Sequence, residues 1–157
     1  MLNKITIVDM TQEHIDAIYA IETRSFAIPW SKNELRRELD NKHAIYKVAL
    51  IGNTANNNNN TEITGYAGLW HIVNEGQITN IAVDTQYRRM GIGSILIQSM
   101  IAYAQEHEMI GLTLEVRTSN IAAQELYKKY GFLPEGIRKR YYADNGEDAI
   151  IMWKYFH

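Results

Sequence analysis

The chain has 157 residues, of which 46% are hydrophobic and 22% are charged, and this balance favours a globular domain with a sizeable core. The formal net charge of -2 argues against an extended nucleic-acid partner, which usually requires a basic surface. The absence of cysteine excludes a disulfide framework, a thiolate metal site and a cysteine nucleophile. Neither a signal-like nor a membrane-spanning apolar run is recognised, so we expect a cytoplasmic protein without a membrane partner.

Hydrophobic periodicity and turn residues divide the first half of the chain into helical and extended segments. Ser31 and Glu34 have the Ser-x-x-Glu form of a capping box, which predicts the start of a helix. Residues 52–61 end in a run of asparagines, a polar tract that predicts a mobile hairpin loop. The predicted elements are a strand at Lys4–Val8, helices at Thr11–Arg24 and Ser31–Leu39, and strands at Tyr46–Ile51, Glu62–Val73 and Gln77–Val83, the last two joined near 74–76.

The second half of the chain alternates helices with strands and ends in two strands. A core-facing helical stripe is predicted by the spacing of Ile95, Leu96, Ser99, Met100 and Tyr103. The predicted elements are a helix at Ser94–Glu108, a strand at Gly111–Val116, a helix from a cap at Ser119 or Asn120 to Tyr130, and strands at Phe132–Tyr141 and Ala149–Tyr155. We therefore expect an α/β fold with a mixed sheet, in one domain that spans residues 1–157.

The loop Arg88–Gly93 (RRMGIG) follows the predicted strand 77–83 and precedes the helix that begins at Ser94. A strand that turns through glycines into a helix presents free N–H groups and the positive end of the helix dipole, an arrangement that binds phosphate. A Walker A loop would need a lysine after the second glycine, and a dinucleotide fingerprint would need glycine in place of Leu96. Both loops are disfavoured, although Glu115 lies at the spacing of the acidic residue in a nicotinamide-binding domain.

The same loop matches the pattern Gln/Arg-x-x-Gly-x-Gly/Ala in full, through Arg88, Gly91 and Gly93. In this the chain resembles the GNAT superfamily of acetyl-coenzyme A-dependent N-acetyltransferases. The resemblance implies acetyl-coenzyme A as co-substrate, no metal, and a mixed, largely antiparallel central sheet of about seven strands with helices on both faces. The residues that it implies for cofactor binding are Ile81, Ala82, Val83, Arg88, Arg89, Met90, Gly91, Ile92, Gly93, Ser94 and Asn120.

Glu115, Asn120 and Tyr127 form a second group of candidate residues. Glu115 lies near the end of a predicted strand, Asn120 opens the next helix, and Tyr127 lies two turns along that helix. Because an amine must be neutral to attack a thioester, Glu115 could accept its proton directly or through water, and Tyr127 could donate to the leaving thiolate. A backbone N–H of residues 81–83 could stabilise the oxyanion. Taken singly, the three residues are more typical of a solvent-facing carboxylate, a helix cap and a core aromatic. Taken together, and following the phosphate loop, they favour the functional interpretation.

Within the superfamily, the chain resembles the RimI-type ribosomal-protein-alanine N-acetyltransferases and related N-terminal acetyltransferases over nearly its whole length. The matching segments are Glu22–Ser31, Asn80–Val83, Arg88–Gly93, Leu114–Arg117, Ser119–Ala123, Tyr130–Phe132, Arg138–Tyr142 and Glu147–Met152. The resemblance implies that Glu115 is the proton acceptor and Tyr127 the proton donor. It also implies a peptide groove lined by Trp30, Tyr141 and Tyr142. The implied substrate is a protein N-terminus, in the RimI case the N-terminal alanine of a small-subunit ribosomal protein.

Several interpretations remain open at this point. Without cysteine, direct attack in a ternary complex is favoured over an acyl-cysteine intermediate. The alternatives are a GNAT enzyme that acetylates lysine or a small amine, a coenzyme A-binding module without turnover, and a nicotinamide-binding domain. Trp30 could instead fix a loop against the core, and Tyr141 and Tyr142 could be ordinary strand aromatics. We expect a monomer or weak dimer.

Overall fold

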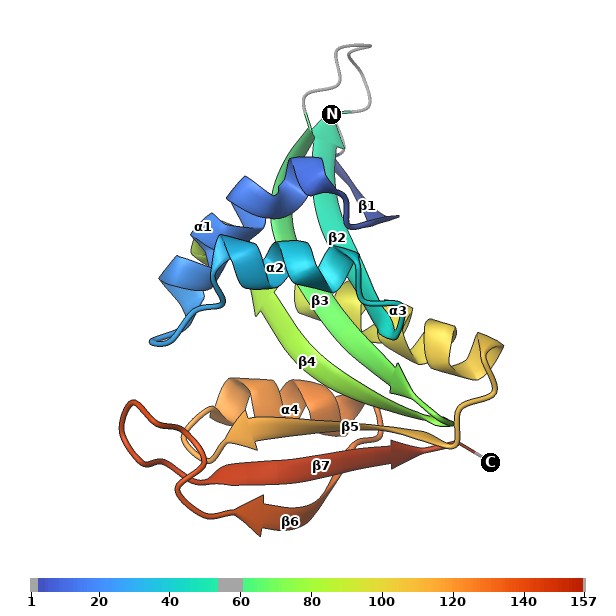
Figure 1. Cartoon of the computed structure of the whole chain (residues 1–157), viewed down its shortest axis with the longest axis vertical. Helices are drawn as coiled ribbons and strands as arrows, with labels where there is room; N and C mark the ends of the chain where they lie inside the picture. Colours follow the sequence, from blue (N-terminus) through green and yellow to red (C-terminus); the bar gives the residue numbers. More distant parts are fainter. Residues whose placement is uncertain (1–2, 54–60, 157) are drawn as a thin grey trace.

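The structure, a computed structural model, describes residues 3–53 and 61–156 (Figure 1). Its elements are β1 (Asn3–Asp9), the short 3-10 helix η1 (Gln12–His14), α1 (Ile15–Ser25), α2 (Lys32–Leu39), β2 (Ala44–Asn53), β3 (Thr61–Ile72), β4 (Glu75–Val83), the 3-10 helix η2 (Thr85–Tyr87), α3 (Ile92–Glu106), β5 (Gly111–Arg117), α4 (Ile121–Lys129), β6 (Leu133–Arg138) and β7 (Ala149–Tyr155).

Seven strands form one sheet in the order β1-β2-β3-β4-β5-β7-β6. Every neighbouring pair is antiparallel except β4 and β5, which run parallel. The crossover between these two strands is made by α3, as expected for parallel neighbours. The predicted mixed, largely antiparallel sheet of about seven strands is therefore confirmed.

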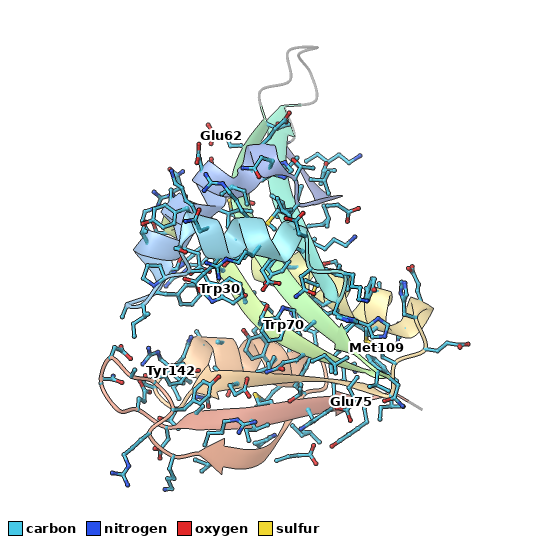
Figure 2. All side chains as sticks on the ribbon, viewed as in Figure 1. Trp30, Glu62, Trp70, Glu75, Met109 and Tyr142 are labelled. Atoms are coloured by element: carbon cyan, nitrogen blue, oxygen red, sulfur yellow. The ribbon has the colours of Figure 1, made fainter. Side chains whose placement is uncertain are left out.

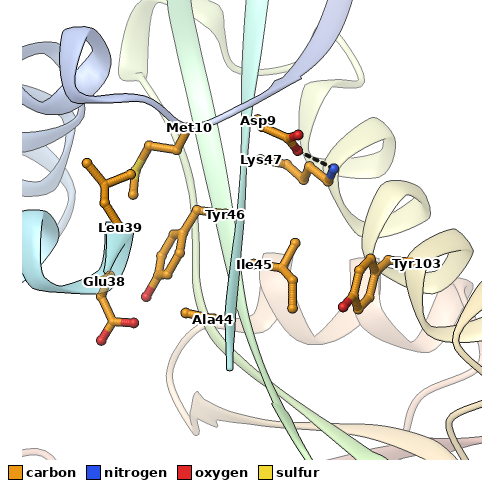
Figure 3. A pocket seen from close by; sticks show the side chains of 9 residues that line it. All are labelled: Asp9, Met10, Glu38, Leu39, Ala44, Ile45, Tyr46, Lys47 and Tyr103. Carbon is orange, nitrogen blue, oxygen red and sulfur yellow. Dashed lines mark hydrogen bonds and ion pairs between the residues drawn. The ribbon is translucent and has the colours of Figure 1, made fainter. Parts of the chain in front are cut away.

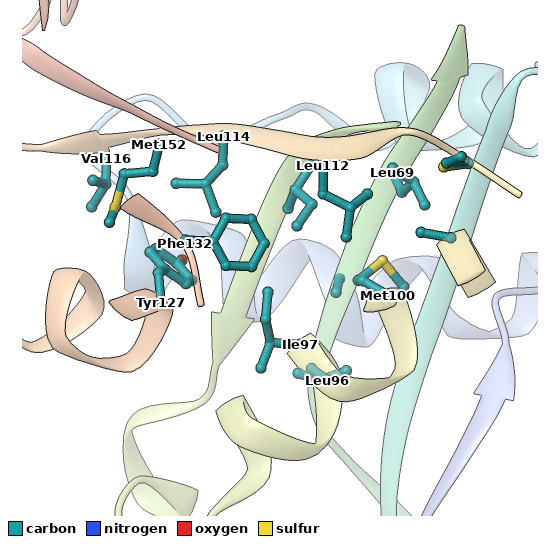
Figure 4. Close-up of a cluster of buried hydrophobic side chains, with 14 of the residues drawn as sticks. Leu69, Leu96, Ile97, Met100, Leu112, Leu114, Val116, Tyr127, Phe132 and Met152 are labelled. Atoms are coloured by element: carbon teal, nitrogen blue, oxygen red, sulfur yellow. The ribbon is translucent and has the colours of Figure 1, made fainter. Parts of the chain in front are cut away.

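Helices cover both faces of the sheet, which confirms a second prediction (Figure 1). α3 and α4 pack on one face, where Leu96, Met100 and Tyr127 join residues of β5 and β7 in the larger hydrophobic core (Figure 4). On the opposite face, α1 and α2 pack over β2–β4 and enclose a smaller core around Tyr66. Gly68 makes room for this second core, because a Cβ there would lie 2.1 Å from the ring of Tyr46.

β4 and β5 separate soon after they begin. Their parallel pairing is limited to the first three residues of each strand, from Glu75 with Gly111 to Gln77 with Thr113. Beyond that point the two strands diverge, and the sheet divides into two halves (Figure 1). The edge of β4 that faces β5 consequently has no strand partner from residue 78 onward, and its backbone groups are available to a ligand.

A β-bulge in β4 changes which face its side chains point to. Gly68 pairs with Asn80 whereas Leu69 pairs with Ile78, so Thr79 is an extra residue on β4. Before the bulge, Ile78 lies in the larger core beside α3. After it, Ala82 lies in the smaller core beside α1. The bulge therefore determines which side chains of the divided part of β4 face each helical layer.

Most departures from the predicted elements concern their ends. The expected helix 11–24 begins as η1, because the side chain of His14 accepts the N–H of Thr11 at 2.9 Å and closes a separate first turn. The hairpin turns at 73–74, so Glu75 and Gly76 belong to β4. The predicted strand 132–141 ends at Arg138, and the helix predicted from Ser94 already begins at Ile92. Of the predicted loop 52–61, residues 52, 53 and 61 extend β2 and β3, and the rest lies outside the described residues.

Candidate active site

The glycine loop leads into the first turn of α3. Gly91 caps this helix with a left-handed backbone (φ 78°), and Arg89 shares that conformation (φ 65°). Ile92, Gly93 and Ser94 therefore lie in the first helical turn and not in a loop, and their N–H groups have no acceptor within the helix. No heavy atom lies within 4 Å of where a Cβ on Gly91 would sit, so the loop leaves space above the helix end. This arrangement fits a phosphate group.

The side chain of Arg88 contacts the end of β4. Nε of Arg88 donates to the carbonyl of Val83 at 3.3 Å, which ties the loop back to the end of β4. Arg88, Arg89 and Met90 are all exposed.

In the first turn of α3, Gly93 permits the close approach of α3 and α4, because a Cβ on this residue would lie 3.2 Å from Cδ2 of Leu126.

Glu115 lies on the face of β5 that no helix covers. Its neighbours Leu114 and Val116 point into the larger core, whereas Glu115 points to the opposite face. The Glu115 side chain is 11% exposed, and its Oε1 accepts a hydrogen bond from Nε of Arg138 at 3.1 Å. This ion pair was not anticipated from the sequence, where Arg138 was named only as part of a segment that carries the family resemblance. The guanidinium therefore fixes the position of the Glu115 carboxylate.

Tyr127 reaches the same region from the other side of β5. Tyr127 lies on the inner face of α4 and is buried against Phe132, with the two ring centroids 6.1 Å apart. Burial raises the pKa of the Tyr127 phenol to about 12, with a smaller contribution from Tyr142. The phenol is therefore fully protonated at neutral pH and can act as a hydrogen-bond donor. Tyr127 is thus both a core aromatic and a candidate donor.

Tyr142 links the two candidate catalytic residues. Its pKa is raised to about 12, mainly by burial, and the charges of Glu115 and Glu147 contribute to the rise. It also acts on Tyr127, so Tyr142 lies within electrostatic range of both Glu115 and Tyr127. Tyr141 packs edge-on against Tyr142 at 5.1 Å between ring centroids and is 48% exposed. The structure thus places Tyr142 near both candidate catalytic residues, whereas Glu115 and Tyr127 lie on opposite faces of β5.

Asn120 caps α4. Its side-chain oxygen accepts the N–H of Ala123 at 3.2 Å, the contact expected of an N-cap, and the residue is exposed. The structure therefore accounts for Asn120 without a cofactor, and a cofactor contact stays a prediction.

Trp30 lies across the divided strands from Tyr142 (Figure 2). Its ring packs against Tyr46, with centroids 6.5 Å apart. Its backbone N–H donates to Oε2 of Glu22 at 3.2 Å. Trp30 is consequently held by the smaller core, which agrees with the interpretation that it fixes a loop. In the part of the chain that the structure describes, it makes no hydrogen bond or ring contact with Glu115 or Tyr127.

A depression elsewhere on the surface is lined by residues of β1, α2, β2 and α3, among them Glu38, Tyr46 and Tyr103 (Figure 3). It lies beside the first residues of β2, which extend beyond the strand's pairing with β1. None of the predicted site residues lines it. It is therefore separate from the candidate active site.

Comparison with known protein families decides to which family the chain belongs. The model of the acetyltransferase (GNAT) family matches residues 15–132, which include α1, the glycine loop, Glu115 and Tyr127. The chain belongs to the GNAT family of acetyltransferases. This confirms the resemblance noted in the sequence and disfavours the nicotinamide-binding interpretation.

Individual GNAT relatives match along almost their entire length. A Bacillus subtilis protein named as a candidate ribosomal protein bS18-alanine N-acetyltransferase is 43% identical over 154 residues, covering 98% of this chain and 97% of the relative. The ribosomal protein bS18-alanine N-acetyltransferase of Escherichia coli K12 is 34% identical over 149 residues, covering 94% and 95%. The crystal structure of the Escherichia coli ribosomal-protein-S18-alanine N-acetyltransferase gives a TM-score of 0.82 at 31% identity, covering 97% of this chain and 94% of that chain.

These matches confirm that this GNAT protein is an acetyl-coenzyme A-dependent N-acetyltransferase. Within residues 3–53 and 61–156, no group of three or more histidine or acidic side chains is arranged to hold a metal ion. In the same part of the chain, no helix is long and apolar enough to cross a membrane.

Proposed function

We propose that this GNAT enzyme transfers acetyl from acetyl-coenzyme A to the free α-amine of a protein N-terminus, namely the N-terminal alanine of a small-subunit ribosomal protein. The observation that carries the proposal is the 43% identity, over nearly the full length of both chains, to the Bacillus subtilis relative whose name specifies this reaction. The Escherichia coli enzyme of the same name adds a second relative that is similar over nearly its whole length.

The glycine loop and the free edge of β4 are the proposed cofactor site. The first-turn N–H groups of α3, at Ile92, Gly93 and Ser94, would hold the pyrophosphate together with the loop residues from Arg88 to Gly91. The unpaired edge at Ile81–Val83 would hydrogen-bond the extended part of the cofactor, as an added strand would. Asn120 would contact it from the start of α4. When bound, the cofactor supplies an activated acetyl thioester.

Glu115 and Tyr127 are the proposed catalytic residues. Glu115 would accept the proton of the attacking amine, directly or through water, and the hydrogen bond from Arg138 holds its carboxylate in place. Tyr127 would donate a hydrogen bond to the leaving sulfur. Because the pKa of Tyr127 is about 12, well above the ~8.5 of an ordinary thiol, hydrogen bonding is favoured over complete proton transfer. Transfer then proceeds by direct attack, without an acyl-enzyme.

The peptide would enter between Trp30 and the tyrosine pair. Exposed apolar side chains flank this entry on both sides: Phe26 and Ile28 in the segment before Trp30, and Tyr141 beyond β6. An extended peptide N-terminus with small or apolar residues fits such a border better than a charged small amine does. We propose no nucleic-acid, membrane or metal partner, a cytoplasmic location, and a monomer or weak dimer that acts as a single catalytic domain.

Mass spectrometry of a peptide panel incubated with acetyl-coenzyme A tests the proposal. The panel pairs free N-termini (alanine, serine, methionine, glycine) with N-blocked peptides that carry an internal lysine. We expect acetylation only at free N-termini, fastest with alanine. Acetylation of lysine alone would refute the substrate assignment and leave the cofactor assignment intact. Failure to modify any peptide, with acetyl-coenzyme A still raising the Tm, would favour a small-amine enzyme or a silent binding module.

A further inference from the structure

Glu22 on α1 is a buried carboxyl group that lacks an ion-pair partner among the described residues. It is 1% exposed, and in the described part of the chain the other buried carboxyl group is that of Asp84. Asp84 is compensated by a bidentate contact with Arg24, at 2.9 and 2.7 Å. Glu22 forms no such ion pair within the described residues. A buried carboxyl without a cation is destabilising when ionised, so its presence needs a reason other than stability.

The Glu22 carboxylate connects three segments. Glu22 itself lies on α1. Its Oε2 accepts a hydrogen bond of 3.2 Å from the backbone N–H of Trp30, which belongs to the segment between α1 and α2. Its Oε1 accepts Nδ2 of Asn80, on β4, at 3.1 Å. Asn80 lies directly after the bulge, beside Ile81 and in the part of β4 that has separated from β5. Glu22 therefore joins the segment of the proposed peptide groove to the strand of the proposed cofactor site.

The hydrogen bond between Asn80 and Glu22 leaves another polar atom of Asn80 without a partner among the described residues. An ionised carboxylate only accepts hydrogen bonds, so Asn80 must turn its NH2 group toward Glu22. Its Oδ1 is then left buried, without a hydrogen-bond partner in the described residues. A buried unpaired acceptor is unfavourable and is typical of places where function constrains the structure.

We propose that Glu22 is a positioning residue of the acetyl-transfer site, whose carboxylate holds the Phe26–Ser31 segment against β4 and so sets the place of Trp30 relative to the cofactor strand. The inference rests on the proposed function, since it concerns the peptide groove of that site. Glu22 touches neither reacting group and acts only through Trp30 and Asn80.

The ionisation of Glu22 gives the contact a pH dependence. Burial raises its pKa to about 7, partly offset by the hydrogen bonds from Trp30 and Asn80, and Glu34 on α2 adds a smaller rise. The phenol of Tyr46, from β2, also lies within electrostatic range, and β3 contributes the neutral Tyr66 to the same core. A protonated carboxyl group carries no charge and has one oxygen occupied by the proton. Its hydrogen bonds from Trp30 and Asn80 are therefore weaker than those of the carboxylate.

The test compares Glu22→Gln with wild type in steady-state kinetics on an N-terminal alanine peptide and in hydrogen exchange at residues 26–31. At pH 8 we expect the peptide KM to rise roughly tenfold, the loss of one hydrogen bond to a charged group, with kcat and the KM for acetyl-coenzyme A within about twofold. At pH 6, where wild-type Glu22 is itself protonated, the difference in peptide KM should largely disappear. Exchange at residues 26–31 should be faster in the variant at pH 8.

Two further variants make the outcome decisive. In Glu22→Gln/Asn80→Asp, the glutamine can accept from Trp30 and donate to the aspartate, so the peptide KM should return toward the wild-type value. Glu38→Gln is the matched control, because Glu38 also accepts two N–H bonds, here from the side chains of Asn41 and Trp70, but outside this connection. An unchanged peptide KM in Glu22→Gln, a rise that the double variant does not reverse, or an equal rise in Glu38→Gln would overturn the inference.

Failure of the proposed function would look different. If wild type acetylated no peptide N-terminus, the substrate assignment would fall, and hydrogen exchange would still decide the structural part of the inference. Exchange at residues 26–31 that is the same in wild type and Glu22→Gln at pH 8 would overturn it independently of activity.

Discussion

The guanidinium of Arg117 stacks on the ring of Tyr142, with its Cζ 3.9 Å from the ring centroid. The same guanidinium pairs with Asp144 at 2.9 Å and with Glu147 at 3.2 Å. Glu147 in turn accepts the N–H of Ser119 at 2.6 Å, at the turn that leads into α4. The end of β5 therefore holds the 142–147 segment in place, and with it the tyrosine that lies near both candidate catalytic residues.

Arg117→Gln should loosen this segment. We expect the peptide KM to rise roughly three- to tenfold, since cation–π and ion-pair contacts at a partly exposed site contribute ~1 kcal/mol. Acetyl-coenzyme A affinity, measured by calorimetry, should stay the same. Lys129→Gln is the control, because Lys129 lies over Tyr130 in a similar cation–π contact on the exposed side of α4. An equal effect of both variants would show that Arg117 has no special role.

Glu115→Gln should abolish most turnover while cofactor binding is retained. Removing a general base typically lowers the rate ~10²- to 10⁴-fold. The neutral amide also leaves Arg138 without its ion pair, so the Tm is a necessary second measurement. Glu125→Gln, which changes an exposed carboxylate on α4, should keep the wild-type rate. A wild-type rate in Glu115→Gln would remove Glu115 as the proton acceptor.

Tyr127→Phe separates the two roles of this side chain. The ring remains packed against Phe132, so the Tm should change little, whereas loss of the hydroxyl should slow the single-turnover rate. Tyr127→Ala, by contrast, should lower the free energy of unfolding by about 3–5 kcal/mol, because it empties a site in the larger core. If the phenylalanine variant turns over as fast as wild type, Tyr127 is a core aromatic only.

The stability of the protein should fall between pH 5 and pH 8 because of Glu22. Its pKa is about 7 when folded and near 4.5 when unfolded, so within this window the folded state holds a proton that the unfolded chain has lost. The free energy of unfolding therefore decreases as the pH rises through about 7, by up to ~3 kcal/mol from this group. In urea titrations of Glu22→Gln at several pH values, the free energy of unfolding should not show this decrease. A variant as pH-dependent as wild type would contradict the assignment.

This prediction runs opposite to the kinetic one. At pH 8 the Glu22→Gln variant should be the more stable protein and the poorer binder of peptide. If Glu22 were retained for folding, its substitution would lower both the stability of the protein and its affinity for peptide. A variant that is more stable and binds peptide less well therefore indicates a group retained for function.

Local signals made much of the fold predictable from the sequence. The capping box at Ser31 and Glu34 is present, and β7 has the predicted bounds, because caps and alternating runs are written in neighbouring residues. The positions of the glycine loop, Glu115 and Tyr127 followed from the same local order of strand, loop and helix.

Contacts between distant residues could not be predicted in the same way. Glu22 and Asn80 are 58 positions apart, and Arg117 and Glu147 are 30 apart. Whether such residues meet depends on strand register, which no single segment contains. Their only sequence signal was that each belonged to a segment already singled out for the family resemblance.

The bulge at Thr79 has a consequence for how this strand can vary. If Thr79 were paired regularly in place of the bulge, side chains would alternate without interruption, and Asn80 and Ala82 would exchange faces with Ile81 and Val83. The amide of Asn80 would enter the core under α3, and two branched side chains would replace it beside Glu22. Deleting Thr79, by contrast, would remove the bulge and leave every later side chain on its present face. In an alignment of related sequences, a chain that lacks this bulge should therefore also be one residue shorter in this strand.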